Sequence, residues 1–435
     1  MDNTIVILIV ALVFTLTMLM GLNISSVLII SGLTGIFLIT GFDSTISIIQ
    51  IETFSTVASY TLTTIPLFVL MSQFIIKADI VKYLYSLIFI FSRGKSVILG
   101  IFTVILGGFL GAVSGSASAM SAALGQFAVP ELEKHGYNKT FAASIAASAG
   151  SLSTIIPPSI GLIIYGAITQ TSIGSLFIAI IIPGIITIIV LSLIIVVVYL
   201  KERNNQSSTI DDSHNNYSLK NYVISLATGL LIMSAIFGGI YSGIFTPTEA
   251  GGVGAFITFF AAVLLGKVNI DFIKSTTKET IKISAFVMMI MIGATIFSRF
   301  VSLSQLPSRL IDFVDPIANS PTLVIIILLA VFFIAFMFLE GAAAIVMLVP
   351  ITLPLAINVG ITPLEFGVLI TVVGTAGLIT PPVGISTFAV SGVLRISSTA
   401  IFRYTFVYAV IITVVVSGLL LMFPQLINWL PDSMN

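Results

Sequence analysis

The chain has 435 residues, of which 57% are hydrophobic and 8% are charged, and its 17 Lys and Arg balance 17 Asp and Glu. A soluble core could not bury that much apolar side chain, so the composition indicates a multi-pass membrane protein. The neutral balance argues against nucleic acid as a partner, and the absence of cysteine excludes disulfides, thiolate metal sites and a thiol nucleophile.

Apolar segments follow one another along the chain in an order that occurs twice. The first series is a tight hairpin at 4–41, a span at about 56–76, an apolar pair at about 97–131, an interrupted helix at about 139–170 and a long span at about 174–200. The hydrophilic run 201–218 is typical of a flexible linker. The second series is a hairpin at 222–266, an amphipathic stretch at 270–280, and spans or pairs at about 283–303, 321–357, 364–393 and 405–424.

Two kinds of residue interrupt these segments. Small residues fill the stretch from Val113 to Ala119, and Glu340 is followed by Gly341 and three alanines. Pro157-Pro158 and Pro381-Pro382 donate no backbone N–H, so each pair predicts a helix break. In a bilayer, freed carbonyls are tolerated when they are buried in protein or line a wet cavity, so a functional cavity is the economical interpretation.

The interruptions recur at one spacing, which indicates a duplication. The two Pro-Pro pairs are 224 residues apart (381 − 157), and the same offset joins three further pairs: Pro130 with Pro354, Gly136 with Gly360, and Gly150 with Gly374. Lipid-facing kinks in a structural bundle are the alternative, but isolated kinks have no reason to recur at one offset. Matching interrupted segments in two halves are typical of the binding site of a secondary transporter.

Basic residues predict the orientation. With both chain termini outside and the linker 201–218 cytoplasmic, 15 of the 17 Lys and Arg fall on the cytoplasmic side, and Arg299 and Arg309 remain outside. Five crossings in each half would then invert the second half relative to the first. The expected fold is an all-α integral membrane protein with two inverted-topology repeats, 1–200 and 219–435, each with a re-entrant hairpin (about 97–131 and 321–357) and a broken helix (about 139–170 and 364–393).

Several motifs resemble the large membrane subunit of tripartite ATP-independent periplasmic (TRAP) transporters, the DctM-like family. They are Ala112–Ser116 with the alanine-rich run after it, Ile155–Ser159, Gly243–Ala250 and Ile379–Gly384. The resemblance implies sodium-driven import of an organic anion, often a dicarboxylate or sialic acid, across a bacterial inner membrane. It also implies a soluble periplasmic substrate-binding protein, a small four-helix membrane subunit and elevator movement like that of the ion transporter superfamily. Glu340-Gly341 and Ser386 depart from the residues of many members, which leaves the substrate open.

Oxygen-bearing groups near the breaks are the candidate sodium ligands, because sodium prefers several oxygens and the negative ends of half-helices. The first expected site comprises Ser114, Gly115, Ser116, Gly150, Ser151 and Thr154. The second comprises Glu340, Gly341, Ala344, Gly374, Thr375 and Thr380. The alternative is that these small residues only permit tight helix packing.

Hydroxyls close to the breaks are the candidate substrate contacts, namely Ser116, Ser118, Ser159, Ser386 and Thr387. Helix N-termini at the breaks would supply partial positive charge to a carboxylate without a buried arginine. Glu340, the one acid in a deeply apolar run, could ligate sodium, carry a proton or stay neutral and hydrogen-bonded. Arg299 either reaches the membrane interface or pairs with the anion or the binding protein. His135 and His214 are expected in solvated loops.

The predicted function is therefore the permease subunit of a sodium-driven organic anion importer, and an enzyme is not expected. Sodium would be the coupling ion, without a cofactor. A stand-alone sodium/dicarboxylate symporter that needs no binding protein is the alternative within transport. An ion channel and a purely structural subunit are the alternatives outside it.

Overall fold

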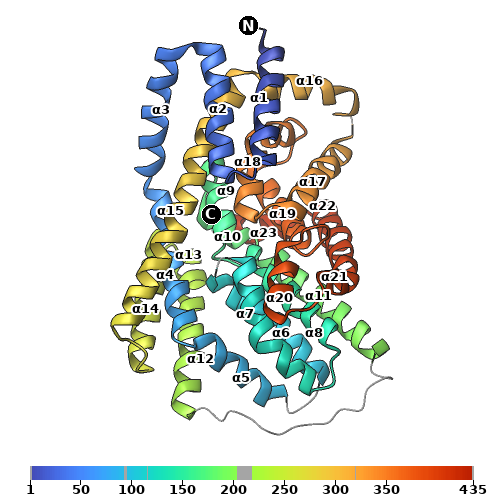
Figure 1. Cartoon of the computed structure of the whole chain (residues 1–435). Coiled ribbons are helices and arrows are strands. Elements are labelled where there is room, and N and C mark those ends of the chain that lie inside the picture. Colours follow the sequence, from blue (N-terminus) through green and yellow to red (C-terminus); the bar gives the residue numbers. More distant parts are fainter. Residues whose placement is uncertain (1, 93–95, 115, 203–217, 319, 434–435) are drawn as a thin grey trace.

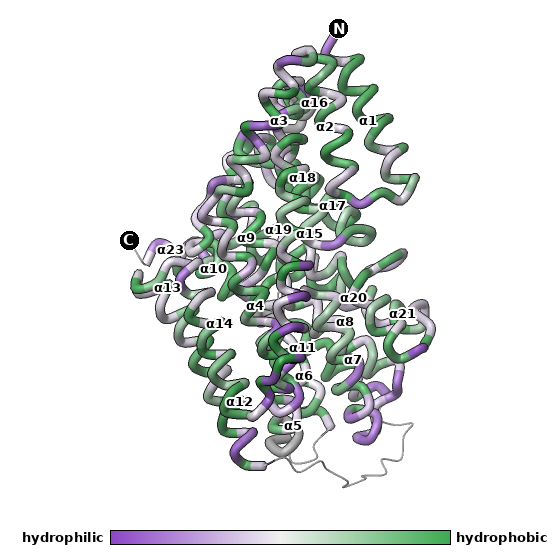
Figure 2. The backbone as a smooth tube through the Cα atoms, turned by 60° about the vertical axis from the view of Figure 1, so that its left-hand side comes forward, coloured by the Kyte–Doolittle hydropathy of each residue, from purple (hydrophilic) through white to green (hydrophobic). Residues whose placement is uncertain are grey.

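The computed structural model describes residues 2–92, 96–114, 116–202, 218–318 and 320–433, and every element in this part of the chain is helical. Eight of the described helices are long and apolar enough to cross a membrane. Figure 2 shows that the helices are largely hydrophobic and that hydrophilic residues gather near helix ends. The all-α membrane fold that the composition predicts is confirmed.

The helices before residue 203 follow the predicted order. They are α1 (Asn3–Leu19), α2 (Ile24–Thr40), α3 (Phe42–Val57), α4 (Thr64–Lys77), α5 (Ile80–Ser92), α6 (Ser96–Ser114), α7 (Ala117–Lys134), α8 (Lys139–Ser151), α9 (Ile160–Thr169), α10 (Ile173–Ala179) and α11 (Ile181–Glu202). Short 3-10 turns, η1 (Tyr60–Thr63) and η2 (Leu152–Thr154), precede α4 and follow α8.

Further helices follow after residue 217. They are α12 (Leu219–Met233), α13 (Gly239–Tyr241), α14 (Pro247–Leu264), α15 (Ile270–Leu303), α16 (Leu306–Ala318), α17 (Pro321–Phe338), α18 (Gly341–Asn358), α19 (Pro363–Gly377), α20 (Ile385–Leu394), α21 (Ser398–Ile411), α22 (Gly418–Met422) and α23 (Gln425–Asp432). Two π-helical turns, η4 (Ser234–Gly238) and η5 (Ile412–Ser417), continue α12 and α21.

One set of helices forms an elongated frame around α4 and α15, which pack against each other. Gly32 and Gly35 of α2 lie so close to α15 that an added Cβ would reach Phe297 or Phe300. Gly254 of α14 meets Met71 of α4 in the same way. Glycines therefore permit each hairpin, α1–α2 and α12–α14, to lie directly on one of the two long helices.

The remaining helices form a second unit that contains both interrupted segments. In it α7 packs on α8 and α20, and α17 packs on α19. A Cβ at Gly150 would lie 2.2 Å from the Ser121 hydroxyl, and a Cβ at Gly374 would lie 2.8 Å from Phe336. The offset-matched glycines Gly150 and Gly374 thus bring each broken helix against its hairpin.

Amphipathic helices α5 and α16 connect the frame to the second unit. They lie at opposite ends of the molecule, with α16 close to the N-terminus and α5 close to the start of α12 (Figure 1). Each follows a residue in the left-handed region, Asp79 (φ 60°) before α5 and Gln305 (φ 56°) before α16. The two connectors therefore begin with the same unusual backbone turn.

Left-handed residues match between the halves elsewhere as well. The matching pairs are Gly21 with Gly243, Gly41 with Gly266, Gly136 with Gly360, and Gln170 with Arg395. Side chains other than glycine rarely adopt this region, so its repetition is informative. Left-handed backbone therefore recurs at spacings of 222 to 225 residues, close to the 224-residue offset of the Pro-Pro pairs.

Two expectations need correction. The amphipathic stretch 270–280 and the span 283–303 are one continuous 34-residue helix, α15, because no proline or glycine stands between them. His135 is only 2% exposed, and its Nδ1 lies 2.8 Å from the Glu131 carbonyl at the end of α7, so it does not lie in a solvated loop. His214, also expected in a loop, lies outside the described residues.

Candidate functional site

A cavity of about 250 Å³ lies where the interrupted segments meet the frame. Four elements of the second unit contribute to it: the tips of α6–α7 and α17–α18, and the breaks of α8–α9 and α19–α20. Helices α4 and α15 form the opposite wall. Its polar lining residues are Ser72, Gln73, Ser116, Ser118, Thr154, Ser159, Glu340 and Thr371.

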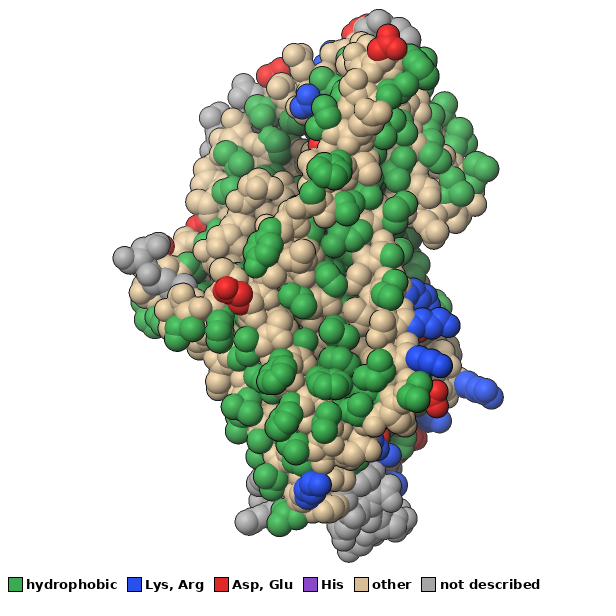
Figure 3. Space-filling model, turned by 90° about the vertical axis from the view of Figure 1, so that its left-hand side faces the viewer, with side chains coloured by type: hydrophobic (Ala, Val, Ile, Leu, Met, Phe, Trp, Pro, Cys, Tyr) green, Lys and Arg blue, Asp and Glu red, His purple; other side chains and the backbone are tan. Residues whose placement is uncertain are grey.

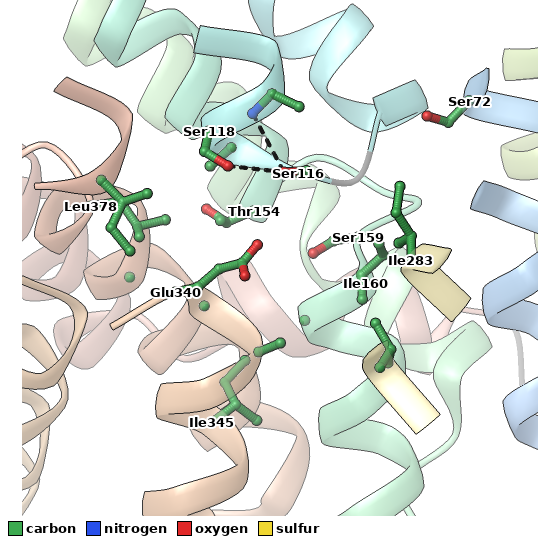
Figure 4. Close-up of a pocket in the computed structure, with 18 of the residues that line it drawn as sticks. Ser72, Ser116, Ser118, Thr154, Ser159, Ile160, Ile283, Glu340, Ile345 and Leu378 are labelled. Carbon is green, nitrogen blue, oxygen red and sulfur yellow. Dashed lines mark hydrogen bonds between the residues drawn. The ribbon is translucent and has the colours of Figure 1, made fainter. Parts of the chain in front are cut away.

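Ser116 forms the first hairpin tip. It is the N-cap of α7, with extended backbone, and its hydroxyl accepts a bond from the Ala119 N–H at 3.4 Å. The Ser118 hydroxyl lies 3.2 Å from that of Ser116, so two hydroxyls stand together at the helix start (Figure 4). The Ser116 N-cap therefore starts α7 beside the cavity and places its hydroxyl there.

The first helix break supplies Thr154 and Ser159. Helix α8 tightens into η2 and stops before Pro157, which has no N–H to continue the ladder. Ser159, in extended conformation, is the N-cap residue of α9, and Thr154 lies at the end of η2. The break therefore turns a threonine and a serine toward the same space.

Glu340 occupies the second hairpin tip, at the N-cap position of α18. Its backbone is extended and Gly341 follows, so its side chain leaves the helix axis and points into the cavity. Figure 4 shows the Glu340 carboxylate directed toward the space between Thr154, Ser159 and Ser118. It is the one charged side chain among the described lining residues, and no lysine, arginine or histidine is among them.

The two broken helices touch each other beside the cavity. The Thr154 hydroxyl lies 2.7 Å from the Thr375 hydroxyl of α19 and 2.9 Å from the Ser151 carbonyl. Thr375 is also 3.1 Å from the Thr371 carbonyl, one turn earlier in α19. This contact joins residues 221 positions apart and brings the two halves together at the site.

The structure brings many of the predicted site residues to the cavity. Ser116, Ser118, Ser159, Thr154, Glu340, Gly341 and Gly374 all line it. Ser114 is the last residue of α6, and Gly115 lies outside the described residues. All four interrupted segments therefore contribute lining residues to this cavity.

Other predicted residues lie behind this lining. Ser386 and Thr387 are fully buried, and Thr387 bonds the Ile379 carbonyl at 3.4 Å, within the second break. Gly150, Ser151, Ala344, Thr375 and Thr380 are also buried and do not line the cavity. Ser151 and Thr380 donate to carbonyls of their own helices, Ser148 at 2.9 Å and Ala376 at 2.8 Å.

Sequence reasoning missed the contribution of the frame. Ser72 and Gln73 of α4 line the cavity, and the same wall has an apolar strip of α15 formed by Ile283, Phe286 and Val287. The signal was present, because Ser72-Gln73 is a polar pair inside the apolar span predicted at 56–76. It was missed because nothing in the sequence shows which helix of another segment faces the hairpin tips.

Comparisons with known proteins agree with this architecture. Residues 10–426 match the family described as tripartite ATP-independent periplasmic transporter, DctM component. The C4-dicarboxylate TRAP transporter large permease protein DctM of Pseudomonas aeruginosa is 32% identical over 374 residues, which cover 83% of this chain and 84% of that protein. The sialic acid TRAP transporter large permease protein SiaM of Vibrio cholerae is 30% identical over 381 residues, covering 86% and 87%.

A solved structure shows the same overall fold. The YdaH transporter of Alcanivorax borkumensis superimposes with a TM-score of 0.66 over 90% of this chain and 89% of that one, at 14% identity. The family match covers nearly the whole chain and includes both hairpins and both breaks. The chain belongs to the DctM family, the large permease subunits of TRAP transporters.

Proposed function

We propose that this permease subunit imports an organic anion, a carboxylate or a sialic-acid-like acid, with energy from a sodium gradient. The observation that carries the proposal is the cavity in which two hairpin tips and two helix breaks converge, lined by hydroxyls and a single carboxylate. Interrupted helices expose backbone carbonyls for a cation and helix N-termini for an anion in one place. Such a site can hold both without a buried arginine.

Two sodium sites fit the oxygens around the breaks. Ser116 and Thr154 belong to the first proposed site, together with carbonyls near Gly150 and Ser151. Glu340 and Gly341 belong to the second, together with Gly374 and the hydroxyls of Thr375 and Thr380. Each net positive charge moved inward gains about 2.3 kcal/mol per 100 mV, so two or more ions per anion could drive accumulation.

The substrate would contact the hydroxyls that face the cavity, those of Ser116, Ser118 and Ser159. Ser386 and Thr387 are buried and would stabilise the second break without facing the cavity. Relatives of similar identity bear names that specify C4-dicarboxylate, sialic acid and 2,3-diketo-L-gulonate. These compounds share a carboxylate and polar oxygens. Other relatives, 29–32% identical, are named for isethionate and ectoine, so overall identity leaves the substrate open and the proposal of an organic anion rests on the cavity.

Inverted repeats and elevator movement are part of the proposal. The left-handed turns that match between the halves, and the position of α5 and α16 at opposite ends of the molecule (Figure 1), support two halves of opposite orientation. The cavity touches α4 at Ser72, Gln73 and Ile76, next to Lys77, and so lies toward the end that the positive-inside rule assigns to the cytoplasm. Movement of the second unit along the frame would carry the cavity to the other side.

Figure 3 shows one face of the frame, where hydrophobic side chains spread over the middle and most of the visible Lys and Arg gather in the lower half. This distribution supports an inner-membrane protein in which the C-terminal end of α11 and the N-terminal end of α12 lie in the cytoplasm. A small four-helix membrane subunit and a soluble periplasmic binding protein would complete the transporter. The binding protein would deliver the anion from the opposite, extracytoplasmic side.

Reconstitution tests the proposal. Proteoliposomes that contain this chain and the small subunit should accumulate a labelled acid when binding protein and an inward sodium gradient are both supplied. Replacement of sodium by potassium, or omission of the binding protein, should each abolish uptake. Sodium-driven uptake without the binding protein would instead establish the stand-alone symporter, and a conductance without saturable anion uptake would establish a channel.

A further inference from the structure

A second polar space lies beside the same helices as the central cavity. It consists of two adjoining cavities of about 300 and 350 Å³ that share Ser59, Ala167 and Gln170. Hydroxyls dominate the lining, and the first cavity also has Thr56, Thr295 and Ser298. We call this combined space the hydroxyl vestibule. No charged side chain is among the residues that line it in the described chain.

The vestibule and the central cavity contact different stretches of the same three helices, α4, α9 and α15. On α9 the central cavity contacts Ser159–Gly161, and the vestibule contacts the C-terminal end, from Gly166 to Gln170. On α15 the corresponding positions are Ile283–Val287 and Met291–Ser298. Five residues separate Gly161 from Gly166, so the two spaces are about 7.5 Å apart along α9.

The segment of α9 between the two spaces is closed. Leu162, Ile163, Ile164 and Tyr165 are all 0% exposed, and the Tyr165 hydroxyl donates to the Pro363 carbonyl at 2.5 Å. Water and small ions therefore have no open path along α9 from one space to the other. Along α9 the two spaces are therefore separated by buried side chains.

The vestibule lies toward the extracytoplasmic end. It is lined by the chain turns at Thr171-Ser172 and Thr246–Thr248. The orientation from basic residues places these turns outside, whereas Lys77 and Lys282 flank the central cavity at the inner end. The vestibule and the central cavity thus face opposite sides of the membrane.

We infer that the hydroxyl vestibule is an entrance site, which receives a small hydrophilic organic anion from outside before it reaches the central cavity. This inference rests on the proposed transport function and adds a second binding surface to it. Hydroxyl and amide groups can donate to carboxylate and hydroxyl oxygens, and without a fixed positive charge they hold the anion weakly enough for onward movement. Gln170, Ser298 and Thr295 are the side chains that would bind it.

The absence of cysteine permits a direct test, because each introduced cysteine is the only thiol in the chain. Ser298→Cys and Ser59→Cys should react with a permanently charged, membrane-impermeant methanethiosulfonate added to the outside of right-side-out vesicles. Gln73→Cys, in the central cavity, should react from the cytoplasmic side. Leu193→Cys is the matched control, since Leu193 is 60% exposed on the apolar outer face of α11, where a charged reagent should not react.

Labelling of Ser298→Cys and Ser59→Cys only in inside-out vesicles, or at the slow rate of Leu193→Cys, would overturn the entrance assignment. This readout needs no transport, so it separates the inference from the proposed function. If the vestibule is labelled from outside but the unmodified protein takes up no acid, the proposed transport function fails. The labelling would then establish only that the vestibule is open to the outside.

Kinetics test whether the vestibule binds substrate. Thr295→Val keeps the side-chain volume but removes a hydroxyl that lies 3.1 Å from the Thr56 hydroxyl. We expect a three- to tenfold higher KM for the anion with kcat unchanged. Thr187→Val is the control, because the Thr187 hydroxyl is buried in α11 and bonds only the Pro183 carbonyl of its own helix. An unchanged KM in Thr295→Val and Gln170→Ala would exclude substrate binding in the vestibule.

Discussion

The hydroxyl oxygens of Thr154 and Thr375 lie 2.7 Å apart and join the two broken helices beside the central cavity. Each threonine belongs to a different half of the chain, so this bond fixes the distance between the two proposed ion sites. Both hydroxyls also lie near carbonyls of their own segments, Ser151 and Thr371. The pair is therefore part of a small oxygen network and not an isolated contact.

Replacement of Thr375 by valine removes this bond without a change in side-chain size. Hydrogen bonds between membrane helices contribute about 0.6 kcal/mol on average, so the loss of stability should be small. The half-saturating sodium concentration should rise several-fold, because the oxygens near the breaks are no longer held together. Sodium-dependent uptake at varied sodium concentration measures this effect, and a Thr154→Val/Thr375→Val double-mutant cycle should show coupling between the two positions.

The control for that experiment is Thr187→Val, which removes a buried hydroxyl with an intrahelical partner in α11. It should leave the sodium dependence unchanged. If uptake by the wild type, Thr154→Val and Thr375→Val depends on sodium concentration in the same way, the threonine pair only supports packing.

Replacement of Glu340 by glutamine tests the one carboxylate of the central cavity. Glutamine keeps the size and removes the charge that can hold a cation. We expect the half-saturating sodium concentration to rise on the order of tenfold, which corresponds to about 1.4 kcal/mol of binding free energy. Uptake measured against sodium and against pH distinguishes the possible roles, since a proton carrier changes the pH profile and a sodium ligand changes the sodium curve.

Glu133→Gln is the matched control, because Glu133 is an exposed residue near the end of α7, far along the helix from its tip. If Glu340→Gln transports with unaltered sodium and pH profiles, Glu340 has no part in coupling. Its place at the second hairpin tip would then matter for structure only.

The sequence predicted the segments of the site better than their partners. Pro157 and Pro381 have no backbone N–H, so each prevents a helix from continuing, and this local effect can be read directly from the sequence. Both breaks therefore fall within the predicted ranges. The Thr154–Thr375 contact does not follow the 224-residue offset, because it depends on how the halves pack across their shared boundary. His135 was misjudged because the sequence does not show that the end of α7 is buried there.

The ion pair between Asp79 and Lys267 ties the start of α5 to the α14–α15 turn. The Lys267 Nζ lies 2.6 Å from the Asp79 carboxylate, and this hydrogen bond raises the pKa of Lys267. A raised lysine pKa stabilises the folded state below the unfolded pKa, and the contribution disappears as the pH rises through the folded pKa. The stabilisation should therefore be constant near neutral pH and decline above about pH 10.4.

Asp79→Asn is the appropriate variant, because asparagine tolerates the left-handed backbone at this position (φ 60°). The partners are partly exposed, so we expect a loss of about 0.2–1 kcal/mol at pH 8. Thermal unfolding in detergent from pH 8 to 11 should show the wild-type advantage disappear at the alkaline end. A wild-type advantage that stays constant from pH 8 to 11 would show that the pair does not act through the lysine charge.

Gly150→Ala tests whether the first broken helix needs direct contact with its hairpin. The added Cβ would lie 2.2 Å from the Ser121 hydroxyl and 2.4 Å from the Ser121 backbone nitrogen, and backbone cannot rotate away as a side-chain end can. Overpacking of this kind costs about 1–3 kcal/mol, so the melting temperature should fall and uptake should be lost through displacement of the tip. Gly252→Ala in α14 is the control, because its Cβ would meet nothing within 4 Å. Equal melting temperatures for the two variants would mean that α8 can move away from α7 freely, contrary to the close approach seen at Gly150.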